Sequence, residues 1–140
     1  MKYLSLLPIL LLVACSATPP AGNGQSSSSI TSAAAHADII VVDSPTPGQT
    51  VTSPLTVTGR ARGPWYFEAS FPVRILDDQG SELAIAPAQA QGDWMTEDWV
   101  PFTVTLSFTT TATDGTVVLQ KDNPSGMPEN DASVEIPVKF

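Results

Sequence analysis

Phe102-Thr103-Val104-Thr105-Leu106-Ser107-Phe108 places an apolar side chain at every second position. Successive side chains of a β-strand point to opposite faces of a sheet, so this alternation is typical of a strand with one buried and one solvated face. Residues 67–75 and 133–140 alternate in the same way. No segment shows the 3.6-residue apolar periodicity of an amphipathic helix. The sequence therefore predicts an all-β domain.

Shorter strand candidates lie between these runs, at residues 39–42, 55–59, 83–87 and 116–121. Segments rich in Gly, Pro, Asn and Asp separate the candidates and are expected to form turns. Seven short strands within about 100 residues predict an antiparallel sandwich of two sheets. Pro72 and Pro137 fall inside two of the runs and lack the N–H that a ladder needs. We therefore expect their strands to lie at sheet edges or to carry bulges.

Residues 1–14 are predicted to be a lipoprotein signal peptide. Lys2 supplies a positive charge, and residues 4–13 are nearly all apolar but too few to cross a bilayer, which takes about 20. The stretch ends in Leu12-Val13-Ala14-Cys15, which holds the only cysteine of the chain. This junction resembles a bacterial lipobox. The resemblance implies cleavage between Ala14 and Cys15 and lipidation of Cys15; the alternative is secretion after a later cut near residues 33–37.

Residues 15–38 are predicted to be a flexible linker rich in Ser, Ala and Pro, because they offer little apolar surface to offset the entropy of ordering. His36 is expected to be a solvated residue of this linker. Two or three acyl chains on Cys15 would hold the protein durably on a membrane. The predicted location is the outer face of the plasma membrane, or the outer membrane if the host has two. Ser16 stands where enteric lipoproteins kept at the inner membrane carry an Asp, which favours the outer one in such a host.

Composition excludes several classes of function. Six Lys and Arg against fourteen Asp and Glu give a formal net charge of -8. Nucleic-acid binding is excluded, since neutralising phosphates takes clustered Lys and Arg. A single cysteine and a single histidine exclude a disulfide framework and a zinc site of thiolates or imidazoles. We expect neither a resident metal nor a cofactor.

Catalysis is not predicted. Nucleophilic hydrolysis needs a base placed next to Ser or Cys. The only His lies in the linker, and Cys15 is expected to carry lipid. The carboxylates are explained by a solvated acidic surface, without the convergent groups that an active site needs.

A polar loop network is one candidate site. Its members are Arg60, Glu68, Lys121, Asp122, Asn123, Glu129, Asn130 and Asp131. We expect these cations and carboxylates to meet at one end of the sandwich, in an ion-pair network that orients loops or lines a binding loop. Calcium binding by the oxygens of residues 122–131 is a less favoured alternative to Asn and Asp capping their own backbone.

Aromatic side chains form the second candidate site. Trp65, Tyr66, Trp94 and Trp99 lie in stretches that border the strand candidates, so we expect them in loops. An exposed aromatic shelf stacks on sugar rings or anchors a protein partner. The interpretation that we favour is that these rings close the open ends of the sandwich as part of the core.

The order of these segments resembles the Gmad2 family, immunoglobulin-like domains named from spore-germination proteins of bacteria. The matching stretches are 44–49, 53–61, 67–69, 76–80, 99–102 and 136–138, in this order. The resemblance implies an immunoglobulin-like domain over residues 39–140 in an extracytoplasmic module, often lipid-anchored, with no established catalytic chemistry. A role in germination is not implied.

These observations together predict a non-enzymatic module that is anchored to the membrane through Cys15. We expect it to mediate protein–protein interaction or envelope assembly. The alternative is a glycan- or cell-wall-binding module that uses the loop aromatics. The sequence indicates neither the identity of the partner nor the oligomeric state.

Overall fold

The computed structural model describes residues 36–140, which form seven β-strands and two short 3-10 turns. The strands are β1 (Ile40–Ser44), β2 (Leu55–Arg62), β3 (Ser70–Asp77), β4 (Glu82–Ala90), β5 (Trp99–Leu106), β6 (Asp114–Gln120) and β7 (Ser133–Lys139). The turns are η1 (Gly63–Trp65) and η2 (Pro128–Asn130). The prediction of an all-β domain of seven strands is confirmed.

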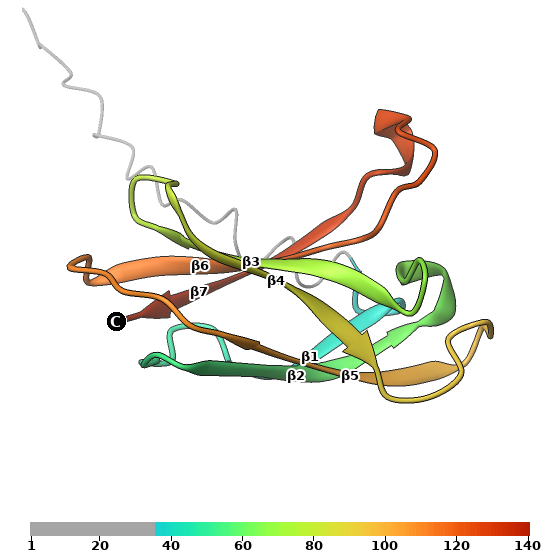
Figure 1. Ribbon diagram of the computed structural model, residues 1–140, viewed down its shortest axis with the longest axis horizontal. Coiled ribbons are helices and arrows are strands. Elements are labelled where there is room, and N and C mark those ends of the chain that lie inside the picture. Colours follow the sequence, from blue (N-terminus) through green and yellow to red (C-terminus); the bar gives the residue numbers. More distant parts are fainter. Residues whose placement is uncertain (1–35) are drawn as a thin grey trace, which may run out of the picture.

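The strands form two layers, with β1, β2 and β5 in one and β3, β4, β6 and β7 in the other (Figure 1). Every neighbouring pair is antiparallel, and the hydrogen-bonded order is β1-β2-β5-β4-β3-β6-β7. β4 joins the layers, because it pairs with β3 along most of its length and with β5 only at Gln89 and Ala90. The sandwich is therefore one continuous sheet folded over its own core.

Alternation in the sequence fills that core. In β5, Phe102, Val104 and Leu106 are buried, while the intervening threonines face outward. In β3, Phe71 is fully buried and its ring meets that of Phe102 edge-on at 5.0 Å between centroids. Edge-to-face packing of this kind stabilises aromatic pairs beyond the area that they bury. The two layers are therefore held together by apolar side chains from both inner faces.

The two strand prolines have different surroundings. Pro137 lies on β7, which is the last strand of the order, as expected. Residues 48–51 add hydrogen bonds to the outer side of β7, including one from the N–H of Gly48 to the carbonyl oxygen of Pro137 at 2.7 Å. Pro72 lies on β3, which has neighbours on both sides, so the expectation is wrong for this residue. The ladder with β6 begins one residue later, at Val73, and the partner of Pro72 on β4 is Pro87. Pro72 therefore stands outside the β6 ladder that its missing N–H would weaken.

His36 belongs to the folded domain rather than to a solvated linker, which corrects the prediction made from the sequence. Its carbonyl oxygen accepts hydrogen bonds from the N–H groups of Ile39 and Ile40, both at 2.9 Å. Its ring lies 5.9 Å from that of Trp65. The Trp65 ring gives the imidazole a packing partner that the linker composition does not reveal.

The predicted signal peptide, the cleavage site between Ala14 and Cys15, and most of the linker lie outside the described residues. Within residues 36–140, no helix is long and apolar enough to cross a membrane.

Candidate functional site

Three connections meet at one end of the sandwich: residues 63–69 between β2 and β3, residues 91–98 between β4 and β5, and residues 121–132 between β6 and β7 (Figure 1). We call this end the loop pole. The N–H of Asp122 donates to the carbonyl oxygen of Trp65 at 3.2 Å, and the N–H of Ala90 donates to that of Ala69 at 2.9 Å. Backbone hydrogen bonds therefore tie the connections to one another and to the sheet.

Gly63 lets two of these connections approach closely. A Cβ atom at this position would overlap the carbonyl oxygens of Trp94 and Thr96. Backbone thus packs on backbone, with no room for a side chain between them. The position of the β4–β5 loop depends on this contact.

Trp65 and Tyr66 are core residues, with exposed fractions of 0% and 4%. The ring of Trp65 packs between His36 and Phe71, and the hydroxyl of Tyr66 donates to the carbonyl oxygen of Val100 at 2.7 Å. These two candidate binding residues do not form an exposed shelf, and the interpretation that places their rings in the core is confirmed. They close the end of the core, because η1 turns the chain inward directly after β2.

Burial raises the pKa of Tyr66 to about 12, an effect that the neighbouring backbone of Ala61 opposes in part. The phenolate would be desolvated in this site. The hydrogen bond to Val100 also favours the neutral form, since only the neutral hydroxyl can donate it. Tyr66 is therefore a neutral structural group.

Two of the predicted aromatics, Tyr66 and Trp94, line an open hollow, and of these two Trp94 is the more exposed. The hollow has a volume of about 500 Å³, and its lining consists of Gly63, Pro64, Tyr66, Trp94, Met95, Thr96 and Glu97. Trp94 is half-buried and packs against the core. A ring that is partly held by the core and partly open suits an anchor for a ligand or partner.

Trp99 begins β5, so the prediction that it lies in a loop is wrong. It pairs across the sheet with Arg62, whose guanidinium carbon lies 4.6 Å from the ring centroid, and that of Arg60 lies 5.6 Å away. Arginine stacking of this kind is a cation–π interaction. The neighbouring cations leave Trp99 poorly suited to stacking on a sugar.

Arg62, which the sequence does not single out, is a clamp at the loop pole. Its Nε donates to the carbonyl oxygen of Asp38 and its Nη1 to that of Glu97, both at 2.9 Å. One planar guanidinium thus joins the segment before β1 to the β4–β5 loop. Arg62 reaches Glu97 because β2 pairs with β5, which places Arg62 opposite Trp99. The sequence does not show which distant strands pair.

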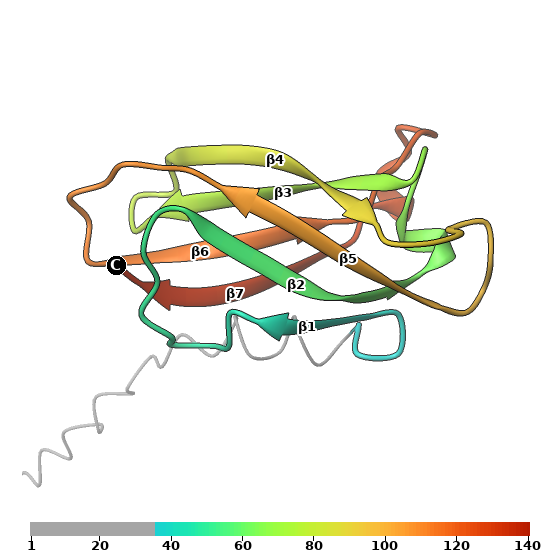
Figure 2. The same ribbon diagram turned by 60° about the horizontal axis from the view of Figure 1, so that its bottom comes forward.

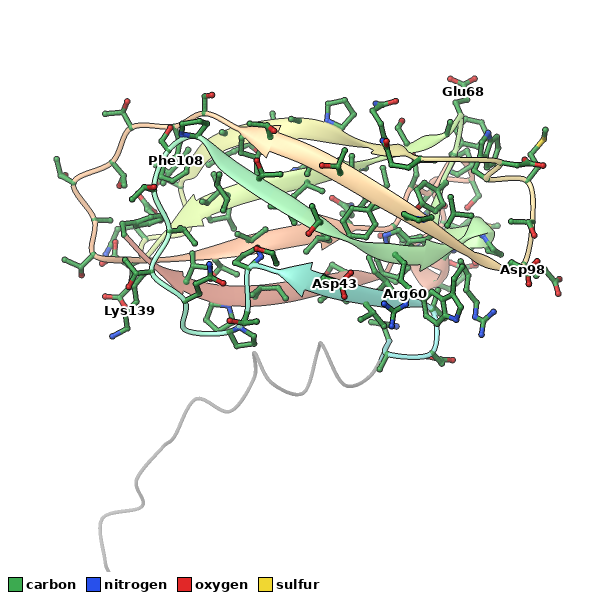
Figure 3. All side chains as sticks on the ribbon, turned by 90° about the horizontal axis from the view of Figure 1, so that it is seen from below. Asp43, Arg60, Glu68, Asp98, Phe108 and Lys139 are labelled. Carbon is green, nitrogen blue, oxygen red and sulfur yellow. The ribbon has the colours of Figure 1, made fainter. Side chains whose placement is uncertain are left out.

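Arg60 does not join the predicted polar network. Its Nη1 lies 3.5 Å from Oδ1 of Asp43 on β1, and both side chains are about half exposed. Figure 3 shows Arg60 and Asp43 side by side, with Glu68 across the width of the same end of the molecule. The expectation that Arg60 meets Glu68, Asp122 or Asp131 is wrong, because β2 and β6 lie in opposite layers.

Four of the predicted network residues do meet in the β6–β7 loop. Nδ2 of Asn123 donates to Oδ1 of Asp131 at 2.7 Å and to the carbonyl oxygen of Met127 at 2.9 Å. Nζ of Lys121 donates to the carbonyl oxygen of Asn130 at 3.3 Å. Ser125, which was not among the predicted site residues, completes the cluster: its hydroxyl donates to Oδ1 of Asn123 and accepts from Nδ2 of Asn130.

This cluster stabilises its own loop. Its oxygens accept hydrogen bonds from amide and hydroxyl groups of the same loop, as expected where Asn and Asp satisfy nearby backbone. The side chains of Asp122 and Glu129 take no part in these bonds. Among residues 36–140, no three His, Cys, Asp or Glu side chains lie close enough to hold a metal ion together.

Each connection of the loop pole also presents one exposed apolar side chain. Phe67 is 40% exposed, Met95 76% and Met127 49%. The alternation in the sequence predicts a strand at Phe67, and the sequence does not single out the methionines. Single exposed apolar residues are ordinary, but here each of the three connections at one end of the molecule carries one.

The chain reverses sharply just before β3. Phe67 and Ser70 exchange two backbone hydrogen bonds, of 3.0 and 3.1 Å, around Glu68 and Ala69, which have φ angles of 50° and 63°. Non-glycine residues in this region cost conformational energy. The turn holds Phe67 at the rim of the loop pole in spite of that cost.

Comparison with known families decides the membership of the chain. Residues 39–139 match the model of Gmad2, the immunoglobulin-like domain of bacterial spore germination. The chain belongs to the Gmad2 family. The Gmad2 match spans all seven strands and confirms the resemblance inferred from the sequence. Immunoglobulin-like domains of this kind are generally non-catalytic. The curated proteins contain no match to the chain.

Proposed function

We propose that this protein is a non-enzymatic module that is anchored outside a bacterial cell membrane by lipid on Cys15 and binds another envelope protein through its loop pole. The observation that carries the binding proposal is that each of the three connections of the loop pole presents one large exposed apolar side chain: Phe67, Met95 and Met127. The lipobox-like junction at Ala14 and Cys15 supports the anchor.

The chemistry of the loop pole supports a protein partner. Methionine is flexible and polarizable, so it adapts to irregular apolar surfaces. Trp94 adds a half-buried ring beside Met95. A protein interface commonly has such an apolar centre with a polar rim. Glu68, Glu97, Asp98 and Glu129 are exposed on the same loops and supply that rim.

Glycan binding is the second candidate, and the open hollow beside Trp94 favours it. Trp65 and Tyr66 are buried, and Trp99 lies against two arginines. A sugar would therefore stack on one ring instead of the four that the sequence offered. The exposed side chains of Phe67, Met95 and Met127 have no role in stacking on a sugar, so we favour a protein partner.

Photo-crosslinking in the host tests the proposal. A photoreactive amino acid is placed at Met95 or Met127, and as a matched control at Thr52, an exposed residue of the β1–β2 connection at the opposite end. We expect a discrete protein adduct from the two loop-pole positions and none from Thr52. Adducts that resist protease but lose mass with glycan hydrolases would favour the glycan candidate. No adduct from either methionine would contradict both.

A further inference from the structure

A second surface, separate from the loop pole, lies along β4. We infer that the free edge of β4 binds an extended segment of a partner protein by strand addition, and that this segment has an apolar centre and Lys or Arg at both ends. The inference does not rest on the proposed function, because it concerns a different face of the molecule.

Part of the backbone of β4 has no strand partner. β4 pairs with β3 from Glu82 to Gln89, but with β5 only at Gln89 and Ala90. In an antiparallel ladder, alternate residues turn their N–H and C=O groups away from the partner. Between Glu82 and Ala88, those groups face no strand of the described part of the chain. Figure 2 shows β4 along the margin of the sheet.

The side chains of β4 show an inverted pattern, with small residues facing inward and larger apolar residues facing outward. Ala86 and Ala88 lie opposite Val73 and Phe71, which are fully buried, so the alanines share the inner face. The larger side chains, Ile85 and Pro87, are exposed, Ile85 by 50%. A half-buried strand normally turns its larger apolar residues inward.

The exposed side chains border a hollow. It has a volume of about 450 Å³ and is lined by Ser70, Phe71, Pro72, Ile85, Ala86, Pro87 and Asp122. Pro72 and Pro87 lie opposite each other across the two strands. In strand addition, backbone bonds supply affinity and pockets for alternate side chains supply specificity. The free edge of β4 provides the backbone groups, and the hollow provides a pocket for a side chain.

The open edge carries no charge along its centre, although charge is a common protection of edge strands. Edge strands commonly carry Lys or another charge that discourages pairing. No residue of β4 between Leu83 and Ala88 is charged. Pro87 and a register shift opposite Leu76 bound the open stretch, so the added segment pairs over only a few residues. Short pairing makes the flanking charges important for affinity.

Those charges select the partner. Asp77, Asp78 and Glu82 lie at the hairpin end of β4, and Asp122 lines the hollow at the other end. Arg74, on the neighbouring strand, is already paired with Glu82, at 3.5 Å. A second copy of β4 in antiparallel register would bring acidic ends against acidic ends, which is unfavourable. A segment with basic ends meets opposite charge at both.

Fluorescence anisotropy tests the inference with defined probes and the purified full chain in nonionic detergent. The first probe is a labelled peptide of alternating Val and Thr with two lysines at each end, and the second carries glutamates in place of the lysines. We expect the Lys-ended peptide to bind and the Glu-ended peptide to bind at least tenfold more weakly. Equal binding of the two would overturn the partner chemistry.

Two matched variants locate the bound peptide. Ile85→Lys puts a charge on the exposed edge, and Met95→Lys puts one on the exposed loop pole. We expect Ile85→Lys to weaken binding about tenfold or more, Met95→Lys to leave it nearly unchanged, and hydrogen exchange of residues 82–88 to slow in the complex. A larger loss of peptide binding in Met95→Lys than in Ile85→Lys, or failure of the Lys-ended peptide to bind, would overturn the inference. So would a dimer of the chain alone that Ile85→Lys dissociates.

Discussion

Tyr66 is a polar residue that the fold uses as part of its core. Its ring packs edge-on against Phe71, 5.2 Å between centroids, and its hydroxyl satisfies a carbonyl of β5. Sequence alone placed it in a loop next to Trp65, where exposure and burial are equally compatible with the residue types. What decides between them is η1, whose three residues turn both rings inward.

The raised pKa of Tyr66 predicts a loss of stability at high pH. The folded-state pKa is about 12 against 10 in the unfolded chain, so the neutral form is favoured on folding. The resulting stabilisation is complete below pH 10 and is lost as the pH rises from 10 to 12. Tyr66→Phe removes this dependence and, at neutral pH, costs about 1 kcal/mol for the lost hydrogen bond.

Urea denaturation at a series of pH values measures this effect. We expect the unfolding free energies of the parent and Tyr66→Phe to converge between pH 10 and 12. The lysines titrate in the same range in both proteins, so they cancel in the comparison. Parallel curves over that range would show that the hydroxyl is solvated.

At the scale of elements, the alternation in the sequence predicted strands well where one face meets the core. β5 is the clearest example, because Phe102, Val104 and Leu106 are all buried. The same rule failed at the start of β3: Phe67 and Ala69 continue the pattern by chance, but the chain reverses at Glu68 and Ala69, where φ is positive. Alternation in the sequence does not reveal this turn, because Glu and Ala are not typical turn residues.

Contacts between elements were predicted only where they are local. The bonds among Asn123, Asn130 and Asp131 arise within one loop, and residue types close in sequence indicated them. The pairing of Arg60 with Asp43, and the clamp formed by Arg62, depend on which strands become neighbours. That order is set by the packing of the whole core, so short motifs do not contain it.

The junction of the β2–β3 and β4–β5 connections gives a prediction at this scale. Gly63→Ala forces the two backbones apart, because the added Cβ overlaps the carbonyl oxygens of Trp94 and Thr96. We expect a loss of about 2–3 kcal/mol in unfolding free energy, as is typical of overpacking at a buried site. Thermal and urea denaturation measure this loss.

Gly92→Ala is the matched control. It lies in the same β4–β5 loop, and a Cβ there meets nothing within 4 Å. We expect its unfolding free energy to stay within about 0.5 kcal/mol of the parent. If the two alanine variants were equally stable, the close approach at Gly63 would not be present in solution.

On the scale of the whole molecule, the domain is strongly acidic, with five basic residues and fourteen acidic ones between residues 36 and 140. Such a body is repelled by anionic lipid headgroups. Its proposed attachment to a membrane therefore depends on covalent lipid. Acyl chains bind in proportion to the methylene groups that they bury, about 0.8 kcal/mol each, so two or three chains suffice.

The central claim of an anchored binding module is tested most directly by metabolic labelling of the host with an alkyne fatty acid, followed by capture of the protein. We predict that the parent and Ser16→Ala are labelled, whereas Cys15→Ala, which lacks the acceptor sulfur, is not. Equal labelling of Cys15→Ala and the parent, or an unlabelled parent, would contradict the claim.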